Sequence, residues 1–366
     1  MKIGLIYQKF VSAGGLEGYL FRFAQALLDA GHELEVLTGQ TDAQTESIDA
    51  NITKVRLPRS RSRALLAFER AALASGGDLD VDVTLGFGRT TQQDLHRAGA
   101  GCHAAYVDLL HPLKRMGFKC KLELALERDL YTSGRTRHFV VNSDLVRQQL
   151  IEHYSVPAEK FTVIHTAVDT DRFRPAIDGG TRDALRKNMG VLDDRPVLLF
   201  VSRAHRRKGL PALLAAWPKI HAQSGAQLWV AGPDITRFIK ALPNELHDSV
   251  SHLDEVDDIV PLYQAADLFI HPSLYDACAN TVLQSMACGL PGIISTADGA
   301  CGFVQEGVTG WQLRDPSSPD AVANISIRAI RSDRRTMAEK ARERVTPLTW
   351  EAHVTAWESA IRSLAK

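Results

Sequence analysis

The feature that most constrains the fold is an alternation of short apolar strands and amphipathic helices that begins again after residue 190. Apolar side chains between Leu16 and Leu28 recur at helical spacing and lie between two predicted strands. Strands are predicted at 2–7, 33–38, 81–87, 138–142, 161–165, 196–203, 227–232 and 267–273, and further helices at 209–221 and 257–265. This alternation favours parallel sheets with helices on both faces, so the sequence predicts two α/β domains.

The domain boundary is predicted in RPAIDGG (174–180), because Pro, Asp and paired Gly are typical of a linker. We therefore expect a first domain over 1–175 and a second over 185–349, followed by an amphipathic helix over 350–366. Open α/β sheets bind ligands at the carboxyl ends of their strands, and two such domains that face each other form a cleft.

Charge and composition exclude several classes of protein. The 366 residues include 43 Lys plus Arg and 43 Asp plus Glu, so the basic excess of a nucleic-acid-binding protein is missing. A hydrophobic share of 45% is ordinary for a globular protein, and no apolar run reaches membrane-spanning length. The N-terminus resembles a first strand more than a signal peptide. The five cysteines show no zinc-type spacing, which predicts reduced cytosolic thiols.

The segment HPSLYDACANTVLQSMACGLP (271–291) is predicted to run from a strand end through a polar loop into a helix. A helix that opens directly after a strand offers free N–H groups and a positive dipole end, which suit phosphate. Asp276 in the loop and Gln284 in the helix could hold the sugars of a nucleotide-sugar. Asn280 and Thr281 fall where the helix begins, and Asn280 could instead serve as its cap.

Two cations follow the strand that opens the second domain. Arg203 ends that strand, and Lys208 precedes the next helix. An Arg fork and a Lys point charge at such positions can converge on one diphosphate, whose neutralisation is the main electrostatic task of a sugar transferase. The alternative is a solvated basic loop.

In the first domain, Gly14 and Gly15 lie between strand and helix, where they suit either a tight turn or close approach to an anionic ligand.

Together these segments resemble family-4 retaining glycosyltransferases. The resemblance is carried by GGLEGYLFRFAQALLDAGHELEVLT at the N-terminus, by Arg203, Lys208 and Gly209 with Ser202 in place of a glycine, and by the 271–291 segment. It covers Met1 to about Leu313 and the C-terminal helix. It implies the GT-B architecture, in which two facing Rossmann-like domains enclose a deep cleft. The first domain, joined by the final helix, would bind the acceptor, and the second would bind the nucleotide-sugar.

The resemblance also implies roles for individual residues. His103, in R-A-G-x-G-x-H, would orient the sugar or stabilise developing charge, with His96 as the weaker candidate. Asp276 would contact the donor sugar, and Arg203 and Lys208 would hold the diphosphate. Gln284 stands where the family usually has a glutamate for the ribose, so that contact should be weaker. The donor-binding set implied by the resemblance is Gly14, Gly15, Val256, Ala277, Asn280, Thr281 and Gln284.

The implied reaction moves a hexose from a nucleotide diphosphate sugar, expected to be UDP-linked, to a saccharide hydroxyl with retention of configuration. The expected acceptor is a lipopolysaccharide core or another membrane-linked glycan. No cofactor or metal is expected, and the D-x-D pairs at Asp80-Val81-Asp82 and Asp169-Thr170-Asp171 are interpreted as chance. Two alternatives stay open, namely a nucleotide-sugar epimerase of the same fold and a non-catalytic nucleotide-sugar binder.

Residues 109–130 mix leucines and other apolar side chains with Lys114, Arg115, Lys119 and Lys121. Such a segment can dock on anionic lipid, or it can be an ordinary amphipathic helix packed on its domain. A second basic cluster, RLPRSRSR (56–63), could bind the phosphates of an acceptor or be a solvated loop. We therefore expect a cytoplasmic protein that can associate peripherally with the inner face of the cytoplasmic membrane.

Overall fold

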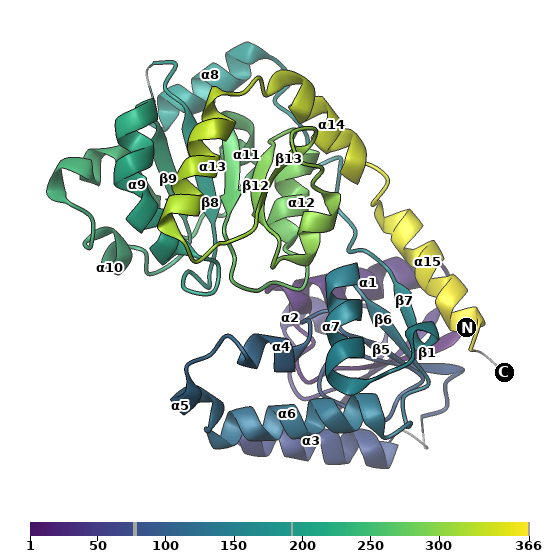
Figure 1. Cartoon of the computed structure of the whole chain (residues 1–366). Helices are drawn as coiled ribbons and strands as arrows, with labels where there is room; N and C mark the ends of the chain where they lie inside the picture. Colours follow the sequence, from purple (N-terminus) through teal and green to yellow (C-terminus); the bar gives the residue numbers. More distant parts are fainter. Residues whose placement is uncertain (76–78, 192, 365–366) are drawn as a thin grey trace. The chain divides into compact units, whose positions relative to one another are not determined.

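The computed structural model describes residues 1–75, 79–191 and 193–364. The chain divides into two compact units, each described here by itself. Unit 1 comprises Met1–His165 and Trp350–Lys366, and unit 2 comprises Thr166–Thr349. Each unit is built on one sheet flanked by helices (Figure 1).

Unit 1 contains a parallel sheet of seven strands among the described residues, in the order β3-β2-β1-β4-β5-β6-β7. The strands are β1 (Lys2–Ile6), β2 (Glu33–Thr38), β3 (Asn51–Lys54), β4 (Val83–Gly86), β5 (Leu95–Arg97), β6 (His138–Val141) and β7 (Phe161–Val163). The helices are α1 (Leu16–Asp29), α2 (Ala43–Glu46), α3 (Arg61–Ser75), α4 (His103–Val107), α5 (Pro112–Arg115), α6 (Phe118–Thr132) and α7 (Asp144–Tyr154). The predicted strands of this half are confirmed, while β3 and β5 were not predicted.

The last helix, α15 (Trp350–Arg362), belongs to unit 1 although unit 2 precedes it in the chain. Its Trp357 is fully buried against Phe23 of α1, with ring centroids 5.1 Å apart. His353 Nδ1 lies 2.7 Å from the His165 carbonyl oxygen, and its Nε2 lies 2.7 Å from the Tyr19 hydroxyl. Burial lowers the pKa of His353 to about 3, so the ring is neutral and can donate at one nitrogen and accept at the other.

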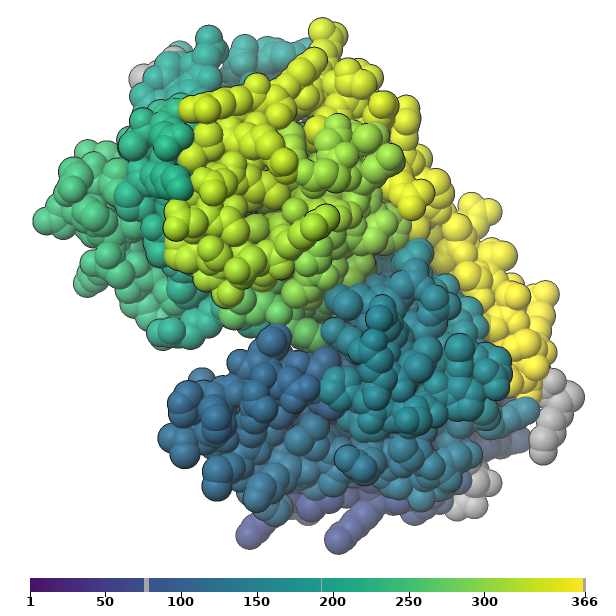
Figure 2. Space-filling view, in the orientation of Figure 1, coloured from purple at the N-terminus to yellow at the C-terminus, as the bar shows by residue number. Residues whose placement is uncertain are grey.

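Unit 2 contains a parallel sheet of six strands within the described ranges, in the order β10-β9-β8-β11-β12-β13. The strands are β8 (Val197–Val201), β9 (Gln227–Ala231), β10 (Val250–Leu253), β11 (Leu268–His271), β12 (Gly292–Ser295) and β13 (Gly310–Leu313). The helices are α8 (Gly179–Asn188), α9 (Leu210–Ser224), α10 (Thr236–Ile239), α11 (Val260–Ala265), α12 (Asn280–Ala287), α13 (Pro319–Arg331) and α14 (Arg335–Val345). α13 packs on α9, and α14 packs on α12. Figure 2 shows the yellow-green residues of α13 at the surface of this unit. Two apolar clusters fill the layers on either side of the sheet, as a parallel sheet covered on both faces requires.

The predicted linker is wrong in part. Gly179 and Gly180 form the first turn of α8, where the Asp178 side chain accepts the N–H of Thr181 as a helix cap. The paired glycines therefore lie inside a helix, and the division between the units falls earlier, between His165 and Thr166. Turn-forming residues and a capped helix start share the same composition, which explains the error.

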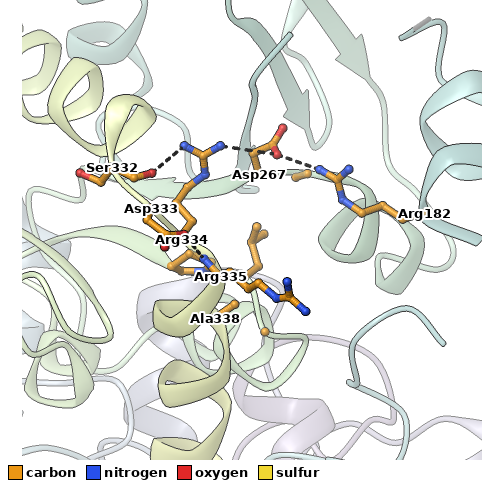
Figure 3. Close-up of a pocket in the computed structure, with 11 residues that line it drawn as sticks. Arg182, Asp267, Ser332, Asp333, Arg334, Arg335 and Ala338 are labelled. Carbon is orange, nitrogen blue, oxygen red and sulfur yellow. Dashed lines mark hydrogen bonds and ion pairs between the residues drawn. The ribbon is translucent and has the colours of Figure 1, made fainter. Parts of the chain in front are cut away.

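Asp267 ties α8 to the sheet of unit 2 at the amino ends of its strands. Its carboxylate accepts from Arg182 at 2.7 Å, from Arg186 at 3.0 Å and from the N–H of Val197 at 2.8 Å. Arg334 approaches the same carboxylate at 4.0 Å. Figure 3 shows Arg182 on one side of Asp267 and Arg334 on the other, around a cavity of about 460 Å³. The single carboxylate compensates charge that would otherwise be partly buried without a partner.

We predict that Asp267→Asn destabilises unit 2 by about 3 kcal/mol, because the buried Arg186 guanidinium loses its only anionic partner among the described residues. Urea unfolding followed by tryptophan fluorescence measures this change. The matched control is Asp320→Asn, since Asp320 makes an exposed ion pair with Lys219 and should contribute under about 0.5 kcal/mol. Equal stability of the two variants would contradict the role given to Asp267.

Candidate functional site

The carboxyl edge of the unit 2 sheet carries a cavity of about 250 Å³. It lies where β8, β9 and β10 end and where α12 begins, which is the edge at which open α/β sheets bind ligands. Its walls are Val201, Ser202, Arg203, Ala231, Gly232, Pro233, Glu255, Val256, Ile259, Tyr263, Thr281 and Gln284. Four predicted site residues, Arg203, Val256, Thr281 and Gln284, therefore line one cavity. The cavity beside Asp267 lies at the opposite edge.

Two glycines allow the backbone to close around this edge. Gly232 follows β9 with φ +138°, and a Cβ there would meet the Ser202 carbonyl oxygen at 1.9 Å. Gly209 follows Lys208 with φ +80°, and a Cβ there would meet the Pro272 carbonyl oxygen at 1.9 Å. Both positions require glycine, for conformation and for space. Gly209 thereby brings the loop that carries Lys208 against the residues that follow β11.

Arg203 is the exposed cation of the cavity. Its side chain is 72% exposed and forms an ion pair with Glu255, which lines the same cavity. Because both partners are exposed, the pair contributes little to stability and is open to exchange with another anion. The loop behind Arg203 is fixed to the segment after β11, since the N–H of Leu274 donates to the Arg207 carbonyl oxygen at 2.8 Å.

Lys208 is the buried cation of the site, only 12% exposed at its side chain. Its ammonium contacts the Asp276 carboxylate and donates to His271 Nε2 at 3.4 Å. Burial lowers the pKa of Lys208 to about 8, and the charge of Asp298 opposes that shift. The ammonium therefore keeps its charge at neutral pH while it lies among groups that can accept hydrogen bonds.

Three of the neighbours of Lys208 could offer ligand atoms to a metal ion. One atom each of His271, Asp276 and Asp298 lies within 4.8 Å of the other two. The Lys208 ammonium lies against two of these three side chains and so supplies a positive charge at the same place. The D-x-D carboxylates are engaged locally: Asp82 accepts from the backbone N–H of Lys2, and Asp169 from that of Arg172.

The start of α12 differs from one expectation. The cap residue is Ala279, and no side chain caps the helix, so the predicted alternative in which Asn280 is the cap is wrong. Asn280 is the first helical residue and is exposed, while Ala277 is buried in the loop before it. Asp298, from the loop after β12, accepts the N–H of Ala279 at 3.1 Å. The side chain of Asn280 is thus left free to contact a ligand.

In unit 1, Gly14 and Gly15 follow β1 and precede α1. Gly14 has φ +123°, a backbone conformation that favours glycine, and the Glu17 carboxylate lies where a side chain would begin. Gly15 has open space where a side chain would begin. The Glu17 carboxylate lies 3.5 Å from the Tyr7 hydroxyl, at the carboxyl end of β1. The turn therefore leaves backbone accessible at the edge of the sheet.

His103 begins α4, after β5, and different carboxylates lie beside its backbone and its ring. Its buried Nε2 makes no hydrogen bond among the described residues. Glu127, buried in α6, accepts the N–H groups of His103 at 2.7 Å and Ala104 at 2.9 Å. His103 Nε2 lies 3.3 Å from Glu123. Burial, then the nearby Arg89 charge, lower the pKa of His103 while Glu123 and Glu127 oppose them.

His96 is the weaker histidine candidate on structural grounds. It lies within β5, is 3% exposed, and burial lowers its pKa to about 3. Its ring packs edge-on against Tyr131. A neutral, enclosed imidazole of this kind is a core residue.

Sequence reasoning missed the carboxylates Glu123 and Glu127 around His103 and the buried pair His271 and Asp298 behind Lys208. Glu127 could have been found, because a glutamate on the apolar face of a helix requires a partner. Asp298 gave no such signal, since TADG is an ordinary turn composition.

Two family models match the chain. Residues 13–172 match the model described as glycosyltransferase family 4, and residues 195–332 match the model described as glycosyl transferases group 1. A probable transglycosylase of Burkholderia thailandensis is 31% identical over 306 residues, which cover 82% of this chain and 79% of that protein. The lipopolysaccharide glucosyltransferase WaaG of Escherichia coli is 23% identical over 353 residues and 93% of each chain.

Solved structures show the same fold. A crystal structure of WaaG superposes with a TM-score of 0.82 at 21% identity over 99% of each chain. The structure of HepE from Anabaena, in complex with UDP and glucose, has a TM-score of 0.75 at 19% identity over 100% of each chain. Two Rossmann-like units, the matched family models and these relatives agree. The chain belongs to glycosyltransferase family 4 and is a glycosyltransferase of the GT-B fold.

Proposed function

We propose that this glycosyltransferase moves a hexose from a UDP-sugar to a saccharide hydroxyl, with retention of configuration. The observation that carries the proposal is the convergence of Arg203, Thr281 and Gln284 on one cavity, with the Lys208 ammonium held beside Asp276 at the same sheet edge. The relative HepE was crystallised with UDP and with UDP-glucose, which supports a uridine donor.

In this proposal the diphosphate lies between Arg203 and Lys208 and in front of the first turn of α12. Arg203 exchanges Glu255 for a phosphate oxygen, because both ions of that pair are exposed. Lys208 is partly desolvated already, so its charge acts strongly on the phosphate that leaves with the nucleotide. Asp276 turns its free oxygen to the hydroxyls of the donor sugar, and Val256 contacts the base.

The reaction exchanges one bond at the anomeric carbon for another. The bond to the diphosphate oxygen breaks, and the acceptor oxygen bonds to the same face of the sugar. The acceptor proton passes to the leaving phosphate oxygen, so no side-chain base is required. Positive charge at Arg203 and Lys208 stabilises the negative charge that develops on that phosphate. We assign Gly14, Gly15 and His103 of unit 1 to the donor sugar and acceptor side, with no metal in the proposal.

Thr281, Asn280 and Ala277 complete the proposed donor site at the start of α12. Thr281 lines the cavity, and Asn280 is exposed beside it. The N–H groups of the first helical turn would donate to the diphosphate. Gln284 offers one neutral oxygen to the ribose, which should bind less strongly than a carboxylate.

We predict that UDP raises the melting temperature of the protein and that Arg203→Ala removes most of the rise. A ligand at one hundred times its Kd stabilises the native state by about 2.7 kcal/mol. A thermal-shift series with UDP, GDP, ADP and their common sugar conjugates measures this effect. Arg206→Ala is the matched control, because Arg206 is exposed on the same loop but does not line the cavity. A rise that survives Arg203→Ala would contradict the assigned diphosphate site.

The variant Gln284→Glu tests the ribose contact in the same series. A carboxylate that accepts the ribose diol should tighten UDP binding about tenfold and raise transfer from a UDP-sugar. Tighter binding with neither transfer nor hydrolysis would favour the non-catalytic binder. Conversion of the sugar with no acceptor present would favour the epimerase.

We propose that the acceptor is a lipopolysaccharide core or another membrane-linked glycan, and that residues 109–130 dock on anionic lipid. Large apolar side chains stand in solvent here, with exposed fractions of 55% for Leu109, 74% for Leu113, 65% for Met116 and 71% for Phe118. Lys114, Arg115, Lys119 and Lys121 are exposed among them. Figure 1 shows α5 projecting at one end of unit 1, and Figure 2 shows this blue stretch at the surface.

Apolar and basic side chains combined in this way suit the interface of an anionic membrane. In the described residues, no helix has the length and apolarity needed to cross a membrane. On this proposal the chain works in the cytoplasm and attaches peripherally to the inner face of the cytoplasmic membrane. The four arginines of RLPRSRSR (56–63), all exposed before and within α3, would add phosphate contacts for the acceptor.

We predict that Leu113→Gln and Phe118→Gln each weaken binding to vesicles that contain phosphatidylglycerol about tenfold, because each removes an apolar side chain from the lipid. Vesicle sedimentation measures the bound fraction. Ile177→Gln is the control, since Ile177 is an exposed apolar side chain of unit 2, 82% exposed. Equal binding of all three variants would contradict the docking surface. So would binding of the parent protein to uncharged phosphatidylcholine vesicles as strong as its binding to phosphatidylglycerol vesicles.

A further inference from the structure

Two buried titratable side chains behind Lys208 have no part in the proposed reaction. His271 ends β11 and is fully buried, and Asp298 follows β12 and is 1% exposed. They come from neighbouring strands of the sheet. Burying a carboxylate is costly unless it is paired, so its presence at this depth calls for a physical reason.

The oxygens of Asp298 are fixed in place by the surrounding loop. Its Oδ1 accepts the N–H groups of Ala279 at 3.1 Å and Ala300 at 2.8 Å. Its Oδ2 accepts from the Ser273 hydroxyl at 3.3 Å and lies 3.4 Å from His271 Nε2. Asp298 therefore lies between the start of α12 and His271, the side chain beside the Lys208 ammonium.

The His271 ring is held beside the Lys208 ammonium. Its ring is stacked on Phe269, with centroids 5.7 Å apart, and faces Phe200 at 6.5 Å. Burial holds the pKa of His271 well below its usual value, so the ring is neutral. His271 Nε2 lies 3.4 Å from the Lys208 ammonium and 3.4 Å from Asp298 Oδ2, and Nδ1 is buried without a hydrogen-bond partner among the described residues. The tautomer with its hydrogen on Nδ1 lets Nε2 accept from Lys208, whereas the other tautomer donates from Nε2 to Asp298.

Titratable groups from three segments act on the Lys208 ammonium. Arg207 on its own loop lowers the pKa of Lys208, while Asp298 after β12 and Cys278 before α12 raise it. Asp276 contacts the ammonium directly. In the proposed reaction Asp276 turns its free oxygen toward the sugar, and Asp298 remains behind Lys208. Burial raises the pKa of Asp298, and the Lys208 charge and the N–H groups of Ala300 and Ala279 oppose that shift.

We propose that Asp298 and His271 are positioning residues, which hold the Lys208 ammonium in place and direct it at the donor diphosphate. This inference rests on the proposed function for the identity of the diphosphate. It does not rest on it for the arrangement of Lys208, His271 and Asp298, whose distances are those of the ligand-free protein.

Asp298→Asn removes the negative charge of the side chain and keeps its shape. The amide oxygen can still accept from Ala279 and Ala300, and the amide nitrogen takes the place that faces Ser273 and His271. The loop is therefore retained while the negative charge is lost. Without that charge the pKa of Lys208 should fall below its value of about 8. Asp320→Asn is the matched control, because it removes a carboxylate from the exposed pair with Lys219.

Two measurements follow on the full chain. Competitive acetylation with acetic anhydride, read by peptide mass spectrometry, gives the pKa of Lys208 without ligand. UDP binding by calorimetry across pH gives the consequence for the donor. A fall of about one pKa unit in Asp298→Asn weakens UDP binding about tenfold at about pH 9 and leaves it nearly unchanged at about pH 6. Lys208→Arg should remove the pH dependence, since its guanidinium stays charged.

The outcomes separate this inference from the proposed function. Two results together support both: a lower pKa of Lys208 in Asp298→Asn, and UDP binding that, as the pH rises, begins to weaken at a lower pH than in the parent. An unchanged pKa overturns the positioning role, whether or not UDP binds. A lower pKa with no UDP binding to either protein supports the coupling and overturns the proposed donor.

A pair of variants at His271 keeps the test decisive if Asp298→Asn does not fold. His271→Gln can keep an acceptor for the ammonium, whereas His271→Phe keeps the stacking and removes the acceptor. We expect UDP binding of His271→Gln within about threefold of the parent and of His271→Phe about tenfold weaker. Equal binding by the two would overturn the role of His271.

Discussion

The proposed donor site depends on one interaction, the pairing of the buried Lys208 ammonium with carboxylates. Lys208 is almost enclosed at the carboxyl edge of the unit 2 sheet, and burial lowers its pKa to about 8. A charge in that position requires compensation, which Asp276 supplies by contact and Asp298 from behind. Gly209 allows the close approach to Pro272 that brings Lys208 there. The loop that carries Lys208, the loop that carries Asp276 and the loop that carries Asp298 meet at this one charge.

In both units the candidate site residues lie on loops at the carboxyl ends of parallel strands. In unit 1 the turn at Gly14 follows β1 and His103 follows β5. In unit 2 Arg203 follows β8 and Asp276 follows β11. Parallel strands end at a common edge, so residues far apart in the chain gather there. In each unit a buried carboxylate accepts backbone N–H groups at the start of a helix. Glu127 does so at α4 in unit 1, and Asp298 does so at α12 in unit 2.

Local patterns in the sequence were sufficient for the fold class. Four of the predicted site residues line one cavity, and their roles stay predictions. Apolar strands alternating with periodic helices predicted the two sheets, and the family resemblance pointed to Arg203, Lys208 and Asp276. The two short strands β3 and β5 lacked a clear pattern: β3 is a polar edge strand, and β5 has only three residues. The linker at 174–180 was misjudged because Asp178 caps a helix that starts with two glycines. His271 and Asp298 were missed because their roles depend on distances across neighbouring strands.

The most direct test of the central claim is a crystal structure of the full chain with UDP. The account predicts the diphosphate within hydrogen-bonding distance of Arg203 and Lys208, with the uracil against Val256 and Arg203 released from Glu255. UDP bound at another edge of either sheet, with Arg203 still paired to Glu255 and Lys208 still held by Asp276, would contradict it.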